Sequence, residues 1–219
     1  MYPVAYEADH VERQHRLTTF FRGLVVIPWL LVGILWGLGA LACTVLAWFA
    51  LVATGRYPQG LYDFNAKAHR FSARVNGFLF LLTDRWPPFD GDEHPEYPVR
   101  LVIPPPQAAY SRWKALLRLI LAIPVMIVAY LLDLLVNVVV ILSWIVIVIT
   151  GKHPKGLFDV LKLGLAYLAR ASTYSALLTE RWPPISPDDG GGAQPATRYA
   201  EPVPGGGSEP PAADATGRG

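Results

Sequence analysis

Asp133 and Asn137 are the polar residues best placed to do chemistry, because they interrupt a long apolar segment. Asp133 is the only Asp, Glu, Lys or Arg between Leu119 and Gly151. Acids inside apolar segments are costly to bury, so they mark ion pathways, helix contacts or interfacial turns. The chain repeats itself, as described below, and the other copy has Gly37 at this place. We therefore expect Asp133 in an interfacial turn, with a helix contact and ion coupling as alternatives.

Other residues that commonly carry chemistry show no recognisable pattern. The five histidines and the single cysteine, Cys43, do not occur at metal-ligand spacing, and the HExxH, CxxC, GxSxG and phosphate-loop patterns do not occur. We therefore expect no catalytic residue, no metal site and no cofactor. The sequence predicts a protein that is not an enzyme.

Basic residues beside the apolar segments form a second candidate site. Lys and Arg near a membrane surface attract anionic head groups. The lipid-binding hypothesis covers Arg56, Lys152, Lys155, Arg74 and Arg170. Ion pairing of the helix cations with nearby acids is the alternative. The expected partners are membrane lipids, mainly anionic, and an unidentified protein partner or a second copy of the chain, but no nucleic acid.

Two apolar segments dominate the chain and must position these residues. Apolar residues make up 53% of the sequence and charged residues 16%. The first segment, 23–55, contains no Asp, Glu, Lys or Arg, and the second, 119–151, contains only Asp133. Each exceeds the roughly 20 residues that a helix needs to cross a bilayer. The sequence therefore predicts an all-α integral membrane protein.

The chain contains one sequence twice, at an offset of 96 residues. The shared residues include Arg16 and Arg112, Pro28 and Pro124, and Trp48 and Trp144. So many rare residues in one register indicate a duplication. We expect a first membrane repeat over 1–90, a linker over 91–96, a second repeat over 97–186 and a disordered tail rich in Pro and Gly over 187–219.

Each apolar segment ends in the same corner. A Gly after Thr is expected to end the helix in the left-handed conformation, and a Pro prevents further helix. A second Gly then precedes the next helix, whose first turn contains an acid. The corner residues are Gly55, Pro58, Gly60 and Asp63, and in the second copy Gly151, Pro154, Gly156 and Asp159.

Shorter elements flank each apolar segment. Extended segments are expected at 2–6 and 97–103, where a small strand pair between the copies would form. After each corner, 61–83 and 157–179 alternate cations with apolar residues. They predict amphipathic helices that lie in the membrane interface or against the bundle.

The length of the apolar segments bears on how often they cross. A single helix over 24–53 would measure about 45 Å, too long for one lightly tilted crossing. We favour a hairpin of two short helices in each copy, broken near 37–39 and near Asp133. One long helix per copy, kinked at Pro28 or Pro124, is the alternative. Hairpins would place the cations, both termini and the tail on the cytoplasmic side of a multi-pass inner-membrane protein.

Taken together, these motifs resemble a known family. They are a Tyr-Pro-Val opening, an Ile-Pro helix, Trp-(x)5-Thr-Gly-(Arg/Lys)-x-Pro-x-Gly-Leu-x-Asp and Leu-Leu-Thr-(Asp/Glu)-Arg-Trp-Pro-Pro. Over 2–90 and 97–186 the chain resembles the bacterial membrane proteins of domain-of-unknown-function family 4389. The resemblance implies an inner-membrane protein with tandem copies, and it brings no activity with it. We expect a non-enzymatic scaffold or interaction component that contacts anionic lipid; a small transporter or channel that uses Asp133 is the alternative.

Overall fold

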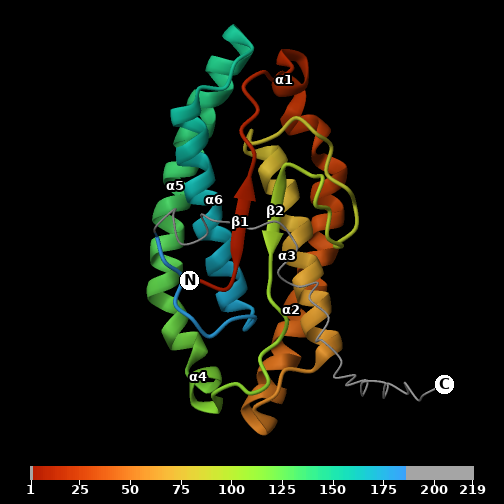
Figure 1. The fold of residues 1–219 in the computed structure, drawn as a ribbon, viewed down its shortest axis with the longest axis vertical. Coiled ribbons are helices and arrows are strands. Elements are labelled where there is room, and N and C mark those ends of the chain that lie inside the picture. Colours follow the sequence, from red (N-terminus) through yellow and green to blue (C-terminus); the bar gives the residue numbers. More distant parts are fainter. Residues whose placement is uncertain (1, 186–219) are drawn as a thin grey trace, which may run out of the picture.

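Each copy of the repeat forms a strand, a short helix, a long apolar helix and an amphipathic helix, in that order (Figure 1). The computed structural model describes residues 2–185, so the tail and its expected disorder lie outside the described residues. The first copy comprises β1 (Ala5–Ala8), α1 (Arg16–Val25), α2 (Ile27–Thr54) and α3 (Gln59–Leu79). The second comprises β2 (Val99–Val102), α4 (Arg112–Leu116), α5 (Arg118–Thr150) and α6 (Lys155–Ser175).

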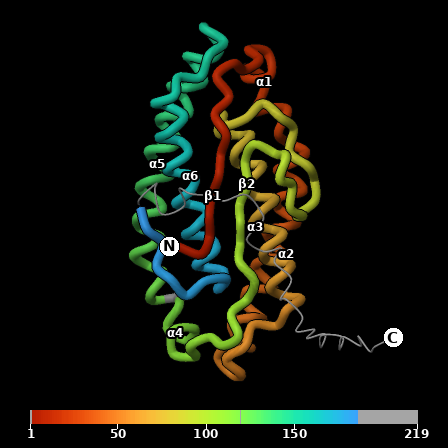
Figure 2. The backbone as a smooth tube through the Cα atoms, viewed as in Figure 1, coloured from red at the N-terminus to blue at the C-terminus, as the bar shows by residue number. Residues whose placement is uncertain are grey.

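The two copies are related by an approximate two-fold axis through the strand pair. The expected strand pair is present, and β1 and β2 run antiparallel with Tyr6 opposite Leu101 and Glu7 opposite Arg100. Tyr6 and Leu101 are equivalent positions of the two copies, so the axis passes beside them. The long helices α2 and α5 consequently run in opposite directions, and the corners after them lie at opposite ends of the molecule (Figure 2).

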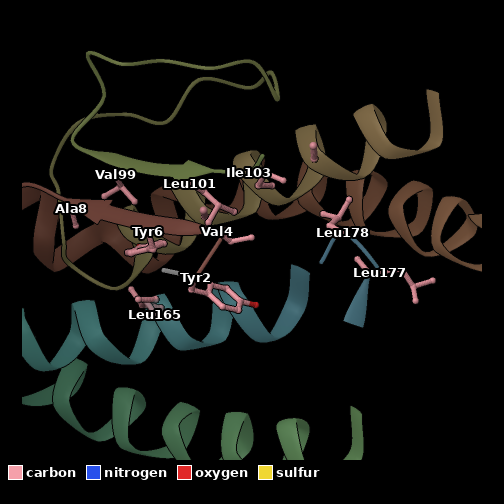
Figure 3. Packing of buried hydrophobic residues seen from close by; sticks show 14 of the residues in the cluster. Tyr2, Val4, Tyr6, Ala8, Val99, Leu101, Ile103, Leu165, Leu177 and Leu178 are labelled. Atoms are coloured by element: carbon pink, nitrogen blue, oxygen red, sulfur yellow. The ribbon is translucent and has the colours of Figure 1, made fainter. Parts of the chain in front are cut away.

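The core lies between the strand pair and the amphipathic helices. Buried and partly exposed residues alternate along both strands, as expected when one face of a sheet packs on helices. Tyr6 and Leu101 are buried, and Figure 3 shows Tyr6 close to Leu165 of α6. Helix α3 packs on β2, helix α6 packs on β1, and each also packs along the long helix of its own copy. The predicted amphipathic helices therefore lie against the bundle.

The expected hairpin in the first copy is wrong, because α2 continues through 37–39 without a break. Gly39 is used for packing instead of turning: a Cβ built on it would lie 2.6 Å from Cζ of Phe64 in α3. A glycine inside a helix can serve a close helix contact as well as a turn. The helix is interrupted at Val26 instead, between α1 and α2 and just before Pro28.

The second hairpin is wrong for a different reason. Helix α5 is continuous through Asp133 and also contains Pro124. The Asn137 amide donates to the backbone oxygen of Asp133 at 2.8 Å and to its carboxylate at 3.1 Å. This bonding one turn apart satisfies both polar groups without an interfacial turn. Each copy therefore has the long helix that was the alternative.

Both long helices expose most of their apolar surface. The segments Ile27–Thr54 and Ile120–Thr150 are long and apolar enough to cross a membrane, judged by length and composition. In the most apolar 18-residue stretch of each helix, only 6% and 22% is buried, respectively. A core helix of a soluble protein would be mostly buried, so these helices present large apolar surfaces to their surroundings.

Candidate functional site

The corners after α2 and α5 end both helices in the same conformation. Gly55 and Gly151 have φ of +71° and +72°, the left-handed region expected for them. Pro58 and Pro154 directly precede α3 and α6. The second glycine of each corner does not precede the next helix as expected, because Gly60 and Gly156 already lie in the first turn of α3 and α6.

Each corner is bonded to the opposite copy. Four of the hydrogen bonds between the copies form two pairs that the two-fold axis relates. They are Tyr110 N to Gly55 O at 2.9 Å, Gln14 N to Gly151 O at 3.2 Å, Trp48 Nε1 to Ala115 O at 2.9 Å and Trp144 Nε1 to Thr19 O at 3.0 Å. The repeated Trp and Gly therefore hold the copies together. Sequence reasoning missed this role, although the shared offset of donors and acceptors was a usable signal.

The residue before each corner proline reaches into the interior. The Tyr57 hydroxyl donates to Ala176 O at 3.2 Å, at the end of the other copy's α6. At the equivalent place His153 is 1% exposed, and its backbone N–H donates to Glu12 O at 2.8 Å. Burial lowers the pKa of His153 to about 4, and the charges of His10 and Arg22 act in the same direction. His153 is therefore neutral at physiological pH.

This buried histidine predicts a pH-dependent stability. The pKa of His153 is about 4 in the folded chain, below its ordinary 6.5, so the unfolded chain binds the extra proton between these values. Stability is then complete above about pH 6.5 and falls as the pH drops towards 4. From pH 7 to 5 the loss should be about 2 kcal/mol. Thermal unfolding across this range should show a smaller loss for His153→Gln; equal losses would contradict a neutral buried His153.

The terminal motif of each copy fastens the start of its short helix. Asp84 accepts from the backbone N–H of His15 at 2.6 Å and forms an ion pair with Arg22. In the second copy, Glu180 accepts from Ser111 N at 2.6 Å and lies 3.6 Å from the Lys114 ammonium. The acid of the Leu-Leu-Thr-acid-Arg motif therefore has a structural use in both copies.

Two of the five predicted lipid-binding cations are not available to lipid. Arg74 is 3% exposed and donates to the backbone oxygens of Asp90 and Asp92. Arg170 is 2% exposed; it donates to Pro184 O at 3.4 Å and lies over the Tyr2 ring. Their prediction as lipid ligands is wrong, because each is buried and donates to carbonyl oxygens of the chain that follows its helix.

The other three predicted cations are exposed, but the structure divides them between the two ends of the molecule. Arg56 lies at the Gly55 end, where the exposed cations include Arg56, Arg112 and Lys114. Lys152 and Lys155 lie at the Gly151 end, where the exposed cations include Arg13, Arg16, Lys152 and Lys155. Sequence reasoning did not pair each corner with the opposite copy's Arg16 or Arg112.

The Gly151 end also contains a shallow hollow of about 410 Å³. Its lining residues are Arg13, Gln14, His15, Thr150, Gly151 and Lys152. Lys152 lies 3.7 Å from the Glu12 carboxylate, and both side chains are more than 60% exposed. Exposed pairs of this kind are weak, so Arg13 and Lys152 at this hollow remain accessible to an external anion.

The predicted acids do not join these cations in one site. Asp63 is exposed and accepts from Gln59 Nε2 at 2.9 Å, and Asp159 is exposed on α6. Asp133 is half-buried at the middle of α5, and its partner Asn137 is exposed. Among residues 2–185, no three His, Cys, Asp or Glu side chains are grouped as metal ligands.

Comparison with known proteins gives one finding. No curated protein and no solved structure matches the chain. The family model described as Domain of unknown function (DUF4389) matches residues 16–90 and again residues 112–186. The matches coincide with the two copies and together cover more than half of the chain. The chain therefore belongs to the DUF4389 family and carries its domain twice in tandem.

Proposed function

We propose that this protein is a non-enzymatic component of the bacterial inner membrane that binds anionic lipid head groups at both ends of the molecule. The observation that carries the proposal is that each exposed apolar helix ends beside exposed cations. Arg56 lies at the end of α2, and Lys152 lies at the end of α5. Apolar helices that bring cations to the head-group level bind anionic membranes through their apolar surface and through the charge of these cations.

The repeated residues support a scaffolding or interaction role. The corner glycines, the repeated tryptophans and the terminal acids are used in contacts within the chain. These contacts hold the two copies together, and the exposed cations can contact external partners. The proposal places the polar surface and the termini on the cytoplasmic side, where anionic lipid and a protein partner or second copy would meet it.

A transporter or channel that uses Asp133 has less support. Helix α2 packs on α3 and α4, whereas α5 packs on α6 and α1. The equivalent of Asp133 on α2 is Gly37, which has open space around it. A pathway between two equivalent helices would need polar groups from both, and Asp133 is already bonded by its own helix.

Removing the end cations tests the lipid proposal. The variant Arg56→Gln with Lys152→Gln and Lys155→Gln should lose affinity for phosphatidylglycerol by about fivefold per cation at low salt, and less as salt is raised. Vesicle flotation and native mass spectrometry measure the loss. The matched control is Lys67→Gln, whose ammonium is paired with Asp92 at 2.8 Å, away from both ends. If the triple variant keeps the wild-type affinity at low salt, the lipid proposal is wrong.

A further inference from the structure

The exposed apolar residues of the long helices include one stripe along each helix, and other exposed apolar side chains, such as Leu35 and Tyr130, lie on neighbouring faces. On α2 the stripe includes Ile27, Leu31, Ile34, Leu38, Leu41 and Val45, all more than 40% exposed. On α5 it includes Ile127, Leu131, Leu134, Val138, Ile141 and Ile145, also more than 40% exposed. Spacings of three and four residues place each set on one helix face. The stripes run along more than half of the length of each helix.

Each stripe faces away from the strand pair, because an amphipathic helix lies between. Phe64 and Phe71 of α3 pack on the α2 glycines, Gly39 and Gly33, while the other side of α3 meets Val99 of β2 at Gly77. Helix α6 separates α5 from β1 in the same way. The two-fold axis passes through the strand pair, and α3 and α6 pack on it, so α2 and α5 lie beyond the same face of the sheet.

Charged groups lie level with the interior of α2, away from both of its ends. Lys67 lies between Phe64 and Phe71 on α3, and these two rings pack at Gly39 and Gly33, in the first half of α2. The Lys67 side chain is 46% exposed and pairs with Asp92, which is 63% exposed. Next to it Arg70 pairs with Glu93 at 2.6 Å, and the Glu93 side chain is 69% exposed.

The strand pair lies at the same level. Lys162 of α6 donates to Ala8 O at the end of β1. Two residues further along α6, Gly164 packs on Val136 near the middle of α5. Figure 1 likewise places β1 and β2 beside the middle of the long helices. On this sheet Arg100 pairs with Glu7 at 3.1 Å.

These positions bear on the direction in which α2 and α5 meet a bilayer. If either helix crossed the bilayer, the Lys67 and Arg70 ion pairs and a two-stranded sheet would lie at the depth of the hydrocarbon core. Exposed charges are very unfavourable there, and open strands do not occur in contact with lipid. A crossing α5 would also hold exposed Asn137 at mid-depth.

We infer that the protein lies flat in one leaflet: the stripes of α2 and α5 both rest in the hydrocarbon, parallel to the membrane plane, and the strand pair faces water. The inference rests on the proposed membrane association and replaces the multi-pass topology expected from the sequence. It also explains the two cationic ends. When the molecule lies flat, the Gly55 end and the Gly151 end reach head groups of the same leaflet.

Exposed aromatic residues fit the same orientation. Trp86 and Phe89 are 52% and 50% exposed and stack on Trp29 near the start of α2. Trp113 of α4 is 75% exposed, and Trp182 is 50% exposed. Tryptophan prefers the boundary between hydrocarbon and water. In a flat molecule, exposed tryptophans of this kind are expected at the level of the head groups.

Membrane depth measured along one helix tests the orientation. Single cysteines at Leu31, Leu38 and Val45, in a Cys43→Ser background, carry a nitroxide in vesicles that contain phosphatidylglycerol. Power saturation with oxygen and a water-soluble nickel complex gives the depth of each label. A flat α2 predicts the same depth at all three sites. A crossing helix predicts a change of about 10 Å for each seven residues.

Control sites and a label-free measurement separate the outcomes. Lys67→Cys should report water in a flat molecule and hydrocarbon in a crossing one. Polarised infrared dichroism of the unlabelled protein should show helices parallel to the membrane plane. A depth gradient along α2 overturns the flat orientation and leaves membrane association intact. If no stripe site reports lipid, both proposals fail, and a dimer on size-exclusion chromatography would identify a second copy as what covers the stripes.

Discussion

Asp84→Asn is expected to lower the free energy of unfolding by about 3 kcal/mol, because it leaves a buried guanidinium without its counter-charge. The Arg22 side chain is 3% exposed, and that of Asp84 is 14% exposed. Arg22 would keep its bond to Phe78 O at 2.6 Å, which is a neutral acceptor. Thermal and denaturant unfolding of the detergent-solubilised protein measure the change.

The second copy supplies the matched control for this variant. Arg118 donates to Thr179 O at 2.9 Å and stacks over the Tyr174 ring, whereas Glu180 bonds the start of α4. Glu180→Gln therefore removes only a partly exposed pair and should cost about 1 kcal/mol. Equal losses of unfolding free energy for the two variants would show that the Arg22–Asp84 ion pair stabilises the fold no more than the partly exposed pair of Glu180 does.

Replacement of the corner glycines by valine is expected to be the other most damaging change. A β-branched residue in the left-handed conformation costs of order 1–3 kcal/mol before any contact is considered. At Gly55 the added Cβ would lie 3.3 Å from the backbone oxygen of Tyr110, whose own N–H is bonded to Gly55. At Gly151 it would lie 3.0 Å from Nε of Arg16, a side chain that can move. Gly55→Val should therefore cost more than Gly151→Val.

The neighbouring glycines act as controls in the same corners. Gly60 and Gly156 lie in helical turns with nothing within 4 Å of an added Cβ. Gly60→Ala and Gly156→Ala should be neutral or stabilise by up to about 1 kcal/mol. Unfolding experiments on the four single variants give the order. A Gly55→Val protein as stable as wild type would show that the left-handed corner is not required.

The duplication, the two apolar segments and the left-handed glycines could be predicted from the sequence, because each depends on local chemistry. A Thr-Gly pair that precedes a cation and Pro ends a helix whatever surrounds it, and Gly55 and Gly151 have that conformation. The rare residues shared at one offset were enough to identify two copies, which the family match confirms.

Long-range packing decided what the sequence left open. Gly39 is equally suited to a turn and to contact with Phe64, and only the position of α3 selects the contact. Arg56 follows an apolar segment and Arg74 lies in an amphipathic one, and neither context predicts burial, yet the chain after α3 folds back over Arg74 and buries it. The offset between the copies identifies equivalent residues but contains no information on their relative direction. The pairing of Tyr6 with Leu101 makes that direction antiparallel, because hydrogen bonds between distant strands form only in the folded chain.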